Sequence, residues 1–244
     1  MTTTAENALL DAITVASEEG RAIPDAATGE TMGYAPRHSV EDVDAAVAAA
    51  RRAQPAWAAL GHERRSEVLR AIAADVESSA EELARIIAQE QGKPLGGMGA
   101  RFEAAGCAVW LRSAADTPVE PELLFEAEGT RSELHYEPMG VVGAISPWNW
   151  PALIATWQIA PALRMGNTVV AKPSEYTPLS VLALAEILNR HLPEGVLHVV
   201  VGGRDVGAAI AAHPDVDKVM FTGSTATGRK IVEASSGNLA RLTL

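Results

Sequence analysis

The chain has 244 residues, of which 48% are hydrophobic, and this content supports a packed core rather than a disordered segment. Its 20 basic and 31 acidic side chains give a formal net charge of −11, which argues against binding to a nucleic-acid backbone. The single cysteine, Cys107, excludes an intramolecular disulfide, and no apolar run reaches the roughly 18 residues of a membrane span. The N-terminus lacks the pattern of a secretory signal, so we expect a cytoplasmic protein.

Residues 1–116 are predicted to form an N-terminal segment followed by a layer of helices. A turn cluster at 24–30 is expected to link two short strands. Gly92-Lys93-Pro94 should end one helix, and a further helix is expected from about 99 to 113. Two earlier helix starts are indicated by serine–acid pairs with capping-box spacing: Ser39 with Asp42, and Ser79 with Glu82.

Residues 117–139 have a different character, because prolines frame two extended stretches with a short turn at 128–130 between them. This pattern predicts a β-hairpin arm that projects from the globular body. An arm of this kind is more often a contact between subunits than a ligand site, so one interpretation of the chain is a dimerisation protein.

Residues 140–244 alternate between short apolar runs and segments with helical spacing. The runs show no alternation of apolar and polar residues, as expected for strands covered on both faces. Such repetition predicts an α/β fold with a Rossmann-like, doubly wound, parallel sheet of five strands, whose ligands lie at the carboxyl ends of the strands. The five predicted strands are 141–145, 168–171, 197–201, 219–221 and 239–244.

Polar residues follow the first two of these strands. Asn149 is an uncharged amide that could donate a hydrogen bond to a developing oxyanion, although a residue at this point could equally cap the next helix. Lys172 and Glu175 could bind the hydroxyl groups of a ribose, although their spacing also fits an exposed ion pair.

Glycines follow the third and fourth strands. Gly202 and Gly203 permit either the close approach of a ligand or an ordinary turn. Gly223 and Ser224 precede a helix whose free amides could bind a pyrophosphate. The chain lacks both the G-x-G-x-x-G fingerprint and a P-loop, and no two of its six histidines stand at metal-ligand spacing, so no metal site is expected.

Four motifs follow one another along this part of the chain: Pro147-Trp148-Asn149 with Pro151, Gly166-Asn167-Thr168-Val169-Val170 leading into Lys172-Pro173-Ser174-Glu175, Pro193-Glu194-Gly195-Val196, and Phe221-Thr222-Gly223-Ser224-Thr225. In this order and spacing they resemble the aldehyde dehydrogenase superfamily. Thr28-Gly29-Glu30 and Gly92-Lys93-Pro94 fit the family's N-terminal region, so the resemblance covers almost the whole chain from about residue 23. The agreement of several motifs favours a functional role for the strand-end residues.

The resemblance implies the oxidation of an aldehyde to a carboxylic acid with NAD, with NADP also possible, and a homo-oligomer for the full-length family. It makes Asn149 the amide that stabilises the oxyanion. Glu175 would repel a 2′-phosphate and favours NAD, whereas Lys172 could pair with that phosphate. The cofactor residues that it implies are Ile145, Ser146, Trp148, Lys172, Ser174, Glu175, Gly203, Gly207, Phe221, Thr222, Gly223 and Ser224.

The family reaction needs a cysteine thiolate and a glutamate base, which the resemblance places beyond the segment matching Arg241-Leu242-Thr243-Leu244. Cys107 lies in the helical layer, where a lone cysteine is most often a buried hydrophobe. We therefore expect a chain that ends before the catalytic domain and binds cofactor without turnover alone. The alternative to a truncated member of the enzyme family is an inactive NAD-binding module or one half of a split enzyme with a separate catalytic chain. Trp150, Leu153 and Trp157 fit either an apolar substrate wall or helix packing.

Overall fold

The computed structural model describes residues 8–244, so the first seven residues, which bear on the expected lack of a secretory signal, lie outside it. The N-terminal part begins with α1 (Ala8–Ile13) and an antiparallel pair, β1 (Gly20–Pro24) and β2 (Thr31–Pro36). Four helices follow: α2 (Val40–Ala59), α3 (Gly61–Ser78), α4 (Ala80–Gln91) and α5 (Ala100–Asp116). The predicted turn between two short strands and the predicted helical layer are both present.

The two serine–acid pairs behave differently. Ser39 and Asp42 form the predicted capping box, with Ser39 N donating to Asp42 Oδ2 at 2.7 Å and Asp42 N donating to Ser39 Oγ at 3.3 Å. The second capping box is wrong, because Ser79 makes no side-chain cap hydrogen bond. Ser79 also ends α3, and its φ of −94° and ψ of 2° lack the extended conformation that capping requires. The carboxylate of Glu82 instead accepts from Leu9 N at 2.6 Å.

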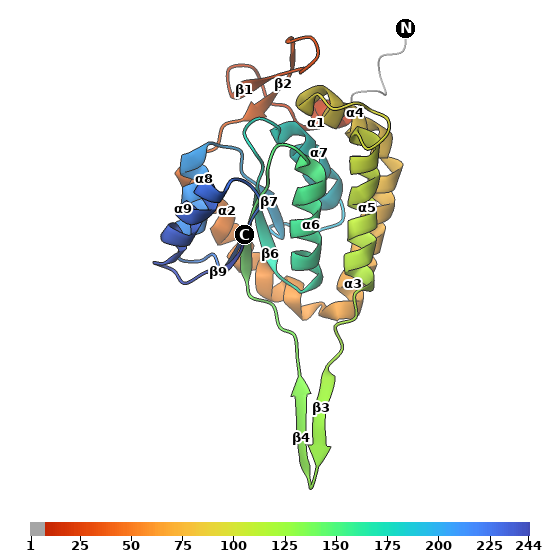
Figure 1. The fold of residues 1–244 in the computed structure, drawn as a ribbon, viewed down its shortest axis with the longest axis vertical. Helices are drawn as coiled ribbons and strands as arrows, with labels where there is room; N and C mark the ends of the chain where they lie inside the picture. The colour runs from red at the N-terminus through yellow and green to blue at the C-terminus, as the bar shows by residue number, and fades with distance from the viewer. Residues whose placement is uncertain (1–7) are drawn as a thin grey trace.

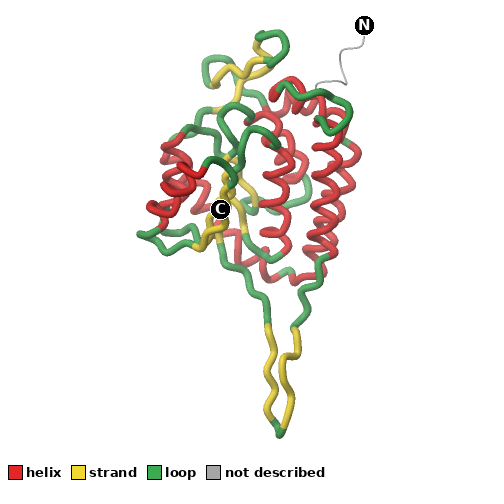
Figure 2. Tube along the Cα trace, in the orientation of Figure 1, coloured by secondary structure: helices red, strands yellow, loops and turns green. Residues whose placement is uncertain are grey.

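The predicted arm is a two-stranded antiparallel hairpin of β3 (Glu122–Ala127) and β4 (Thr130–Leu134), and it extends away from the helices (Figures 1 and 2). Glu128 and Gly129 form its turn with φ values of 51° and 79°, the positive values typical of a tight two-residue hairpin turn. Both strands are exposed along their whole length. The apolar side chains of this arm are therefore without cover. An isolated two-stranded hairpin of this kind is marginally stable in water.

The remaining chain forms the predicted parallel sheet, in the order β7-β6-β5-β8-β9. Its strands are β5 (Val141–Ile145), β6 (Thr168–Lys172), β7 (Leu197–Val199), β8 (Lys218–Phe221) and β9 (Arg241–Thr243), and its helices are α6 (Pro151–Arg164), α7 (Pro178–Asn189), α8 (Arg204–Ala212) and α9 (Thr225–Ser235). Strand β7 is shorter than predicted, because Val201 leaves the sheet and exchanges hydrogen bonds with His38.

Helices cover both faces of the sheet (Figure 1). One face packs against α2 and α8, with α9 beside α8, and the other packs against α6 and α7, with α3, α4 and α5 forming an outer layer. Residues on β5 and its neighbour β6, such as Val141 and Val169, are fully buried, which explains their lack of polar alternation. The chain order reverses between β5 and β8, so their carboxyl ends form the topological switch point where ligands of such sheets bind.

Candidate functional site

Three loops meet at the carboxyl edge of the sheet, and they carry most of the predicted site residues. The loop after β5 is tied to the end of β6, because Ser146 N donates to Lys172 O at 3.1 Å. The loop after β8 is tied to the end of β5, because Thr222 N donates to Ile145 O at 3.1 Å. Gln158 of α6 also donates to Ile145 O, at 3.3 Å. The structure thus brings together residues that lie up to 77 positions apart in the chain, from Ile145 to Thr222.

Asn149 and Trp148 are exposed at the mouth of this edge. Helix α6 begins at Pro151. Trp150 is its N-cap residue, and the Trp150 side chain makes no capping hydrogen bond. Asn149 is therefore not the helix cap that its position alone allowed. Within residues 8–244 no hydrogen-bonding partner is found for the Asn149 side-chain amide, so this amide is available to a ligand.

Two buried carboxylates replace the missing caps of α6 and α7, and sequence patterns did not single out either of them. Glu103 of α5 accepts from Ala152 N and Leu153 N of α6, and Glu90 of α4 accepts from the first amides of α7. Each helix follows a loop that carries predicted site residues. The only signal in the sequence is an acid on the apolar stripe of a helix, which by itself does not tell what the acid binds.

Lys172 is 7% exposed, and its ammonium donates to Pro173 O at 2.9 Å. It is not part of an exposed ion pair, so that alternative is wrong. Burial lowers the pKa of Lys172, while the nearby carboxylates of Glu175 and Asp205 act to raise it. A Cβ atom placed on Gly207 would lie 3.5 Å from Lys172 Cδ, so the start of α8 approaches the same lysine. The predicted ribose and adenine residues are thus neighbours in the structure.

The end of β8 forms a compact turn. A Cβ atom on Gly223 would lie 2.4 Å from Phe221 Cζ, so a larger residue there would require that ring to shift. Ser224 is the N-cap of α9, and its hydroxyl accepts from Thr227 N at 3.2 Å. The first amides of an α-helix have no partner inside the helix, and the positive end of the dipole lies there. The arrangement is suited to an anionic ligand.

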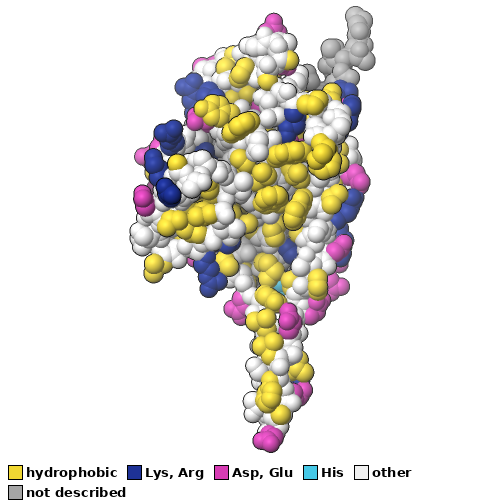
Figure 3. All heavy atoms as spheres, viewed as in Figure 1, with side chains coloured by type: hydrophobic (Ala, Val, Ile, Leu, Met, Phe, Trp, Pro, Cys, Tyr) yellow, Lys and Arg dark blue, Asp and Glu magenta, His cyan; other side chains and the backbone are white. Residues whose placement is uncertain are grey.

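Aromatic side chains continue from Asn149 across α5 and α6, and all of them except the partly buried Trp150 are exposed. The ring of Trp150 lies 5.8 Å from that of Phe102, and Trp157 lies 5.7 Å from Trp110. Figure 3 shows hydrophobic side chains gathered over this face. Trp157 is 38% exposed and is not a core residue. Leu153 instead packs against α5, where a Cβ atom on Gly106 would lie 2.8 Å from Leu153 Cδ1.

Cys107 is fully buried in α5, and burial raises the pKa of its thiol to about 12. It is a packed core residue and not an available thiolate, as predicted. Over the described range, 8–244, no group of three or more His, Cys, Asp or Glu side chains could hold a metal ion. Within residues 8–244, no helix has both the length and the continuous apolar character that a membrane span requires.

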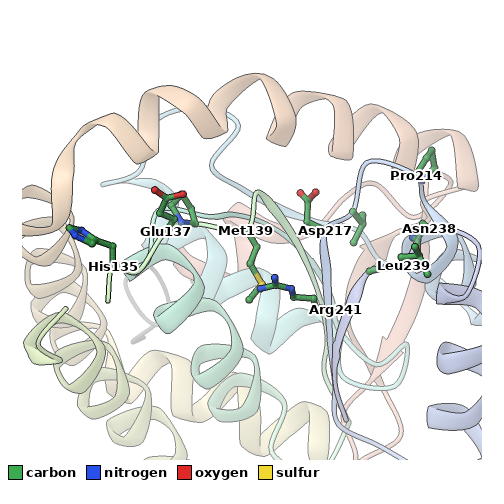
Figure 4. A pocket seen from close by; sticks show the side chains of 11 residues that line it. His135, Glu137, Met139, Pro214, Asp217, Asn238, Leu239 and Arg241 are labelled. Carbon is green, nitrogen blue, oxygen red and sulfur yellow. Dashed lines mark hydrogen bonds between the residues drawn. The ribbon is translucent and has the colours of Figure 1, made fainter. Parts of the chain in front are cut away.

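A cavity of about 620 Å³ lies at the opposite edge of the sheet (Figure 4). Its lining includes Met139, Asp217 and Arg241, which stand at or just before the starts of β5, β8 and β9. Ligands of doubly wound sheets bind at the carboxyl ends of the strands, so this cavity is separate from the candidate site.

Comparisons with known proteins agree on one family. The model of the aldehyde dehydrogenase family matches residues 14–244. The chloroplastic betaine aldehyde dehydrogenase of Amaranthus hypochondriacus is 40% identical over 89% of this chain and 46% of that enzyme, and the geranial dehydrogenase of Castellaniella defragrans is 42% identical over 91% and 48%. The betaine aldehyde dehydrogenase of Staphylococcus aureus, solved with NAD+, is 32% identical with a TM-score of 0.86 over 94% of this chain and 46% of that one. The chain therefore spans about half the length of the relatives it matches.

Proposed function

The chain belongs to the aldehyde dehydrogenase family, and from that premise we propose that this segment binds NAD and supplies the oxyanion-stabilising amide for the oxidation of an aldehyde to a carboxylic acid. The observation that carries the proposal is the meeting of three site loops at the switch point of the sheet, with the Asn149 amide left unpaired among the described residues. Ligand binding at this position is the general behaviour of such sheets.

The residues present fit a dinucleotide. Glu175 would accept hydrogen bonds from the adenosine ribose, with Lys172 beside it, while Gly203 and Gly207 leave room near the start of α8. The turn at Gly223 and the amides of α9 would hold the pyrophosphate. The further residues that we assign to the cofactor are Ile145, Ser146, Trp148, Ser174, Phe221, Thr222 and Ser224. Glu175 would repel a 2′-phosphate, so we propose NAD in preference to NADP.

The chemistry of this segment is electrostatic. The Asn149 amide would donate to the oxygen of the aldehyde as negative charge develops on it, without a change in its own protonation. When bound, the nicotinamide accepts a hydride. Cys107 cannot supply the attacking thiolate, because it is buried and its pKa is raised to about 12. We place the thiolate and the base in residues outside this segment, which matches about half of its relatives' length.

The exposed aromatic rings beside Asn149 would bind the apolar part of the aldehyde. Strand β3 of the hairpin also exposes Leu123, Leu124 and Phe125, and we assign this surface to a contact between subunits, as in a homo-oligomer. Replacement of Leu124 by Asp should then shift the molecular mass measured by light scattering toward that of a single chain. An unchanged mass would place the subunit contact elsewhere.

The test of the main proposal is calorimetric titration of the chain with NAD, beside an assay of aldehyde-dependent NADH formation. We expect binding that Glu175→Ala weakens, and Glu63→Ala is the control, because Glu63 is an exposed acid in the first turn of α3, outside the site loops. Binding without NADH formation favours a cofactor-binding module or one half of a split enzyme. Absence of NAD binding would refute the proposed function.

A further inference from the structure

A buried ion pair lies directly behind the turn that carries Asn149. Glu103 is 0% exposed, and its Oε1 accepts from Ala152 N at 2.9 Å and Leu153 N at 3.1 Å. Its Oε2 accepts from Lys93 Nζ at 2.5 Å. The carboxylate therefore holds the first turn of α6 on one side and a cation on the other.

The same ammonium contacts both residues of the turn. Lys93 Nζ donates to the backbone oxygen of Asn149 at 2.7 Å and lies 4.0 Å from the ring centroid of Trp150. The lysine side chain is 11% exposed, and its contact with Glu103 is partly buried, whereas its hydrogen bond to the Asn149 oxygen lies at an exposed site. Gly92, whose left-handed conformation ends α4, delivers Lys93 to this position.

This geometry matters because the Asn149 side chain has no partner of its own among the described residues. The direction of its amide must be set through its backbone. Trp150 stands at φ −133° and ψ 65°, outside the helical region, so the peptide that joins the two residues is not held by α6 itself. The contact that holds the carbonyl of that peptide comes from Lys93.

We propose that Lys93, anchored by the buried Glu103, is a positioning residue that fixes the Asn149–Trp150 peptide and so directs the Asn149 amide. The inference rests on the proposed function only for what the amide does once it is directed. The positioning itself is a property of the chain that can be measured without cofactor or substrate.

The test separates the loss of a buried charge from the loss of position. Lys93→Met leaves the Glu103 carboxylate buried without its cation, and we expect the thermal midpoint to fall by about 10 °C. The double variant Lys93→Met/Glu103→Gln removes both charges, and its midpoint should return to within a few degrees of the wild type, roughly as for other buried pairs replaced together. Lys230→Met is the control, because Lys230 is an exposed lysine of α9.

The position of the turn is read by ¹⁹F NMR of the chain labelled with 5-fluorotryptophan, with the Trp150 signal assigned from Trp150→Phe. We expect that signal to shift and broaden in the double variant, despite its recovered stability, and to stay unchanged in Lys230→Met. A double variant with a wild-type Trp150 signal would overturn the proposal. Failure of the wild-type chain to bind NAD would instead refute the proposed function and leave this result standing.

Where this segment works with a catalytic domain, the double variant should lower kcat, because the displaced Asn149 amide would no longer meet the oxygen of the aldehyde. A displaced Trp150 signal with an unchanged kcat would overturn the link from Lys93 to the Asn149 amide. A stability that does not recover in the double variant would overturn the role of Glu103 as its anchor.

Discussion

Glu90 offers a measurable pH dependence of stability. Its Oε1 accepts from Leu179 N at 2.5 Å, and its Oε2 accepts from Ser180 N at 3.0 Å and from Ser180 Oγ at 2.6 Å. Burial raises the pKa of Glu90 from its ordinary value of 4.5 to about 7, although these hydrogen bonds and the charge of Arg21 act to lower it. The carboxyl therefore holds its proton more tightly in the folded chain than in the unfolded chain.

The sign of the effect follows from proton binding. Between the two pKa values the folded state binds more protons than the unfolded state, so the free energy of unfolding falls as the pH rises. The contribution of Glu90 is complete below the unfolded value of 4.5 and is lost as the pH passes to about 7. At 1.36 kcal/mol per unit of pKa, the loss between about pH 5 and about pH 8 is about 2 to 3 kcal/mol.

Glu90→Gln removes the titrating group and keeps the shape of the side chain. The amide of glutamine has one acceptor oxygen and one donor nitrogen, so one of the two oxygens that accept from α7 is replaced by a donor. This change lowers the free energy of unfolding by an amount that does not depend on pH. The difference in unfolding free energy between wild type and variant should therefore change by about 2 to 3 kcal/mol over that pH interval, in favour of the variant at the higher pH.

The measurement is urea unfolding followed by circular dichroism, for wild type and variant across the pH series. Glu63→Gln is the matched control, because Glu63 is exposed and should leave the pH dependence unaltered. A difference between wild type and Glu90→Gln that stays constant with pH would refute the reasoning. It would mean that the helix amides and Arg21 outweigh burial at this carboxyl.

Three further outcomes are expected. Glu175→Ala should raise the dissociation constant for NAD roughly 10- to 100-fold, as expected for the loss of a hydrogen bond to a charged group. Cys107→Ser should leave that constant unchanged. Equal effects of the two substitutions in calorimetry would contradict the ribose assignment. The Cys107 thiol should react with a thiol reagent only after unfolding, because burial raises its pKa to about 12, and rapid labelling of the native chain would disprove its burial. Gly140→Ala should lower the thermal midpoint, because Gly140 has a φ of 128° and a Cβ there would lie 2.1 Å from Asp217 Oδ2. That oxygen accepts from Val141 N, so the clash would disturb the start of β5. An unchanged midpoint would contradict this expectation.

Local patterns in the sequence predict the elements and their order. The alternation of apolar runs and helical segments, the capping box at Ser39 and the glycine that ends α4 are local patterns, and the structure has each of them. The positions of Asn149, Lys172 and Glu175 at strand ends could also be predicted, because nearby residues determine where a strand ends.

The contacts that these residues make depend on how distant parts of the chain pack together. The sheet places β8 beside β5, although 76 positions separate Ile145 from its partner Phe221. It brings Glu103 to an amide 49 positions away and Glu90 to one 89 positions away, and it holds Ser79 in a conformation that cannot cap a helix. A buried carboxylate takes whichever donors the packed helices bring to it, and no pattern within its own helix records those donors.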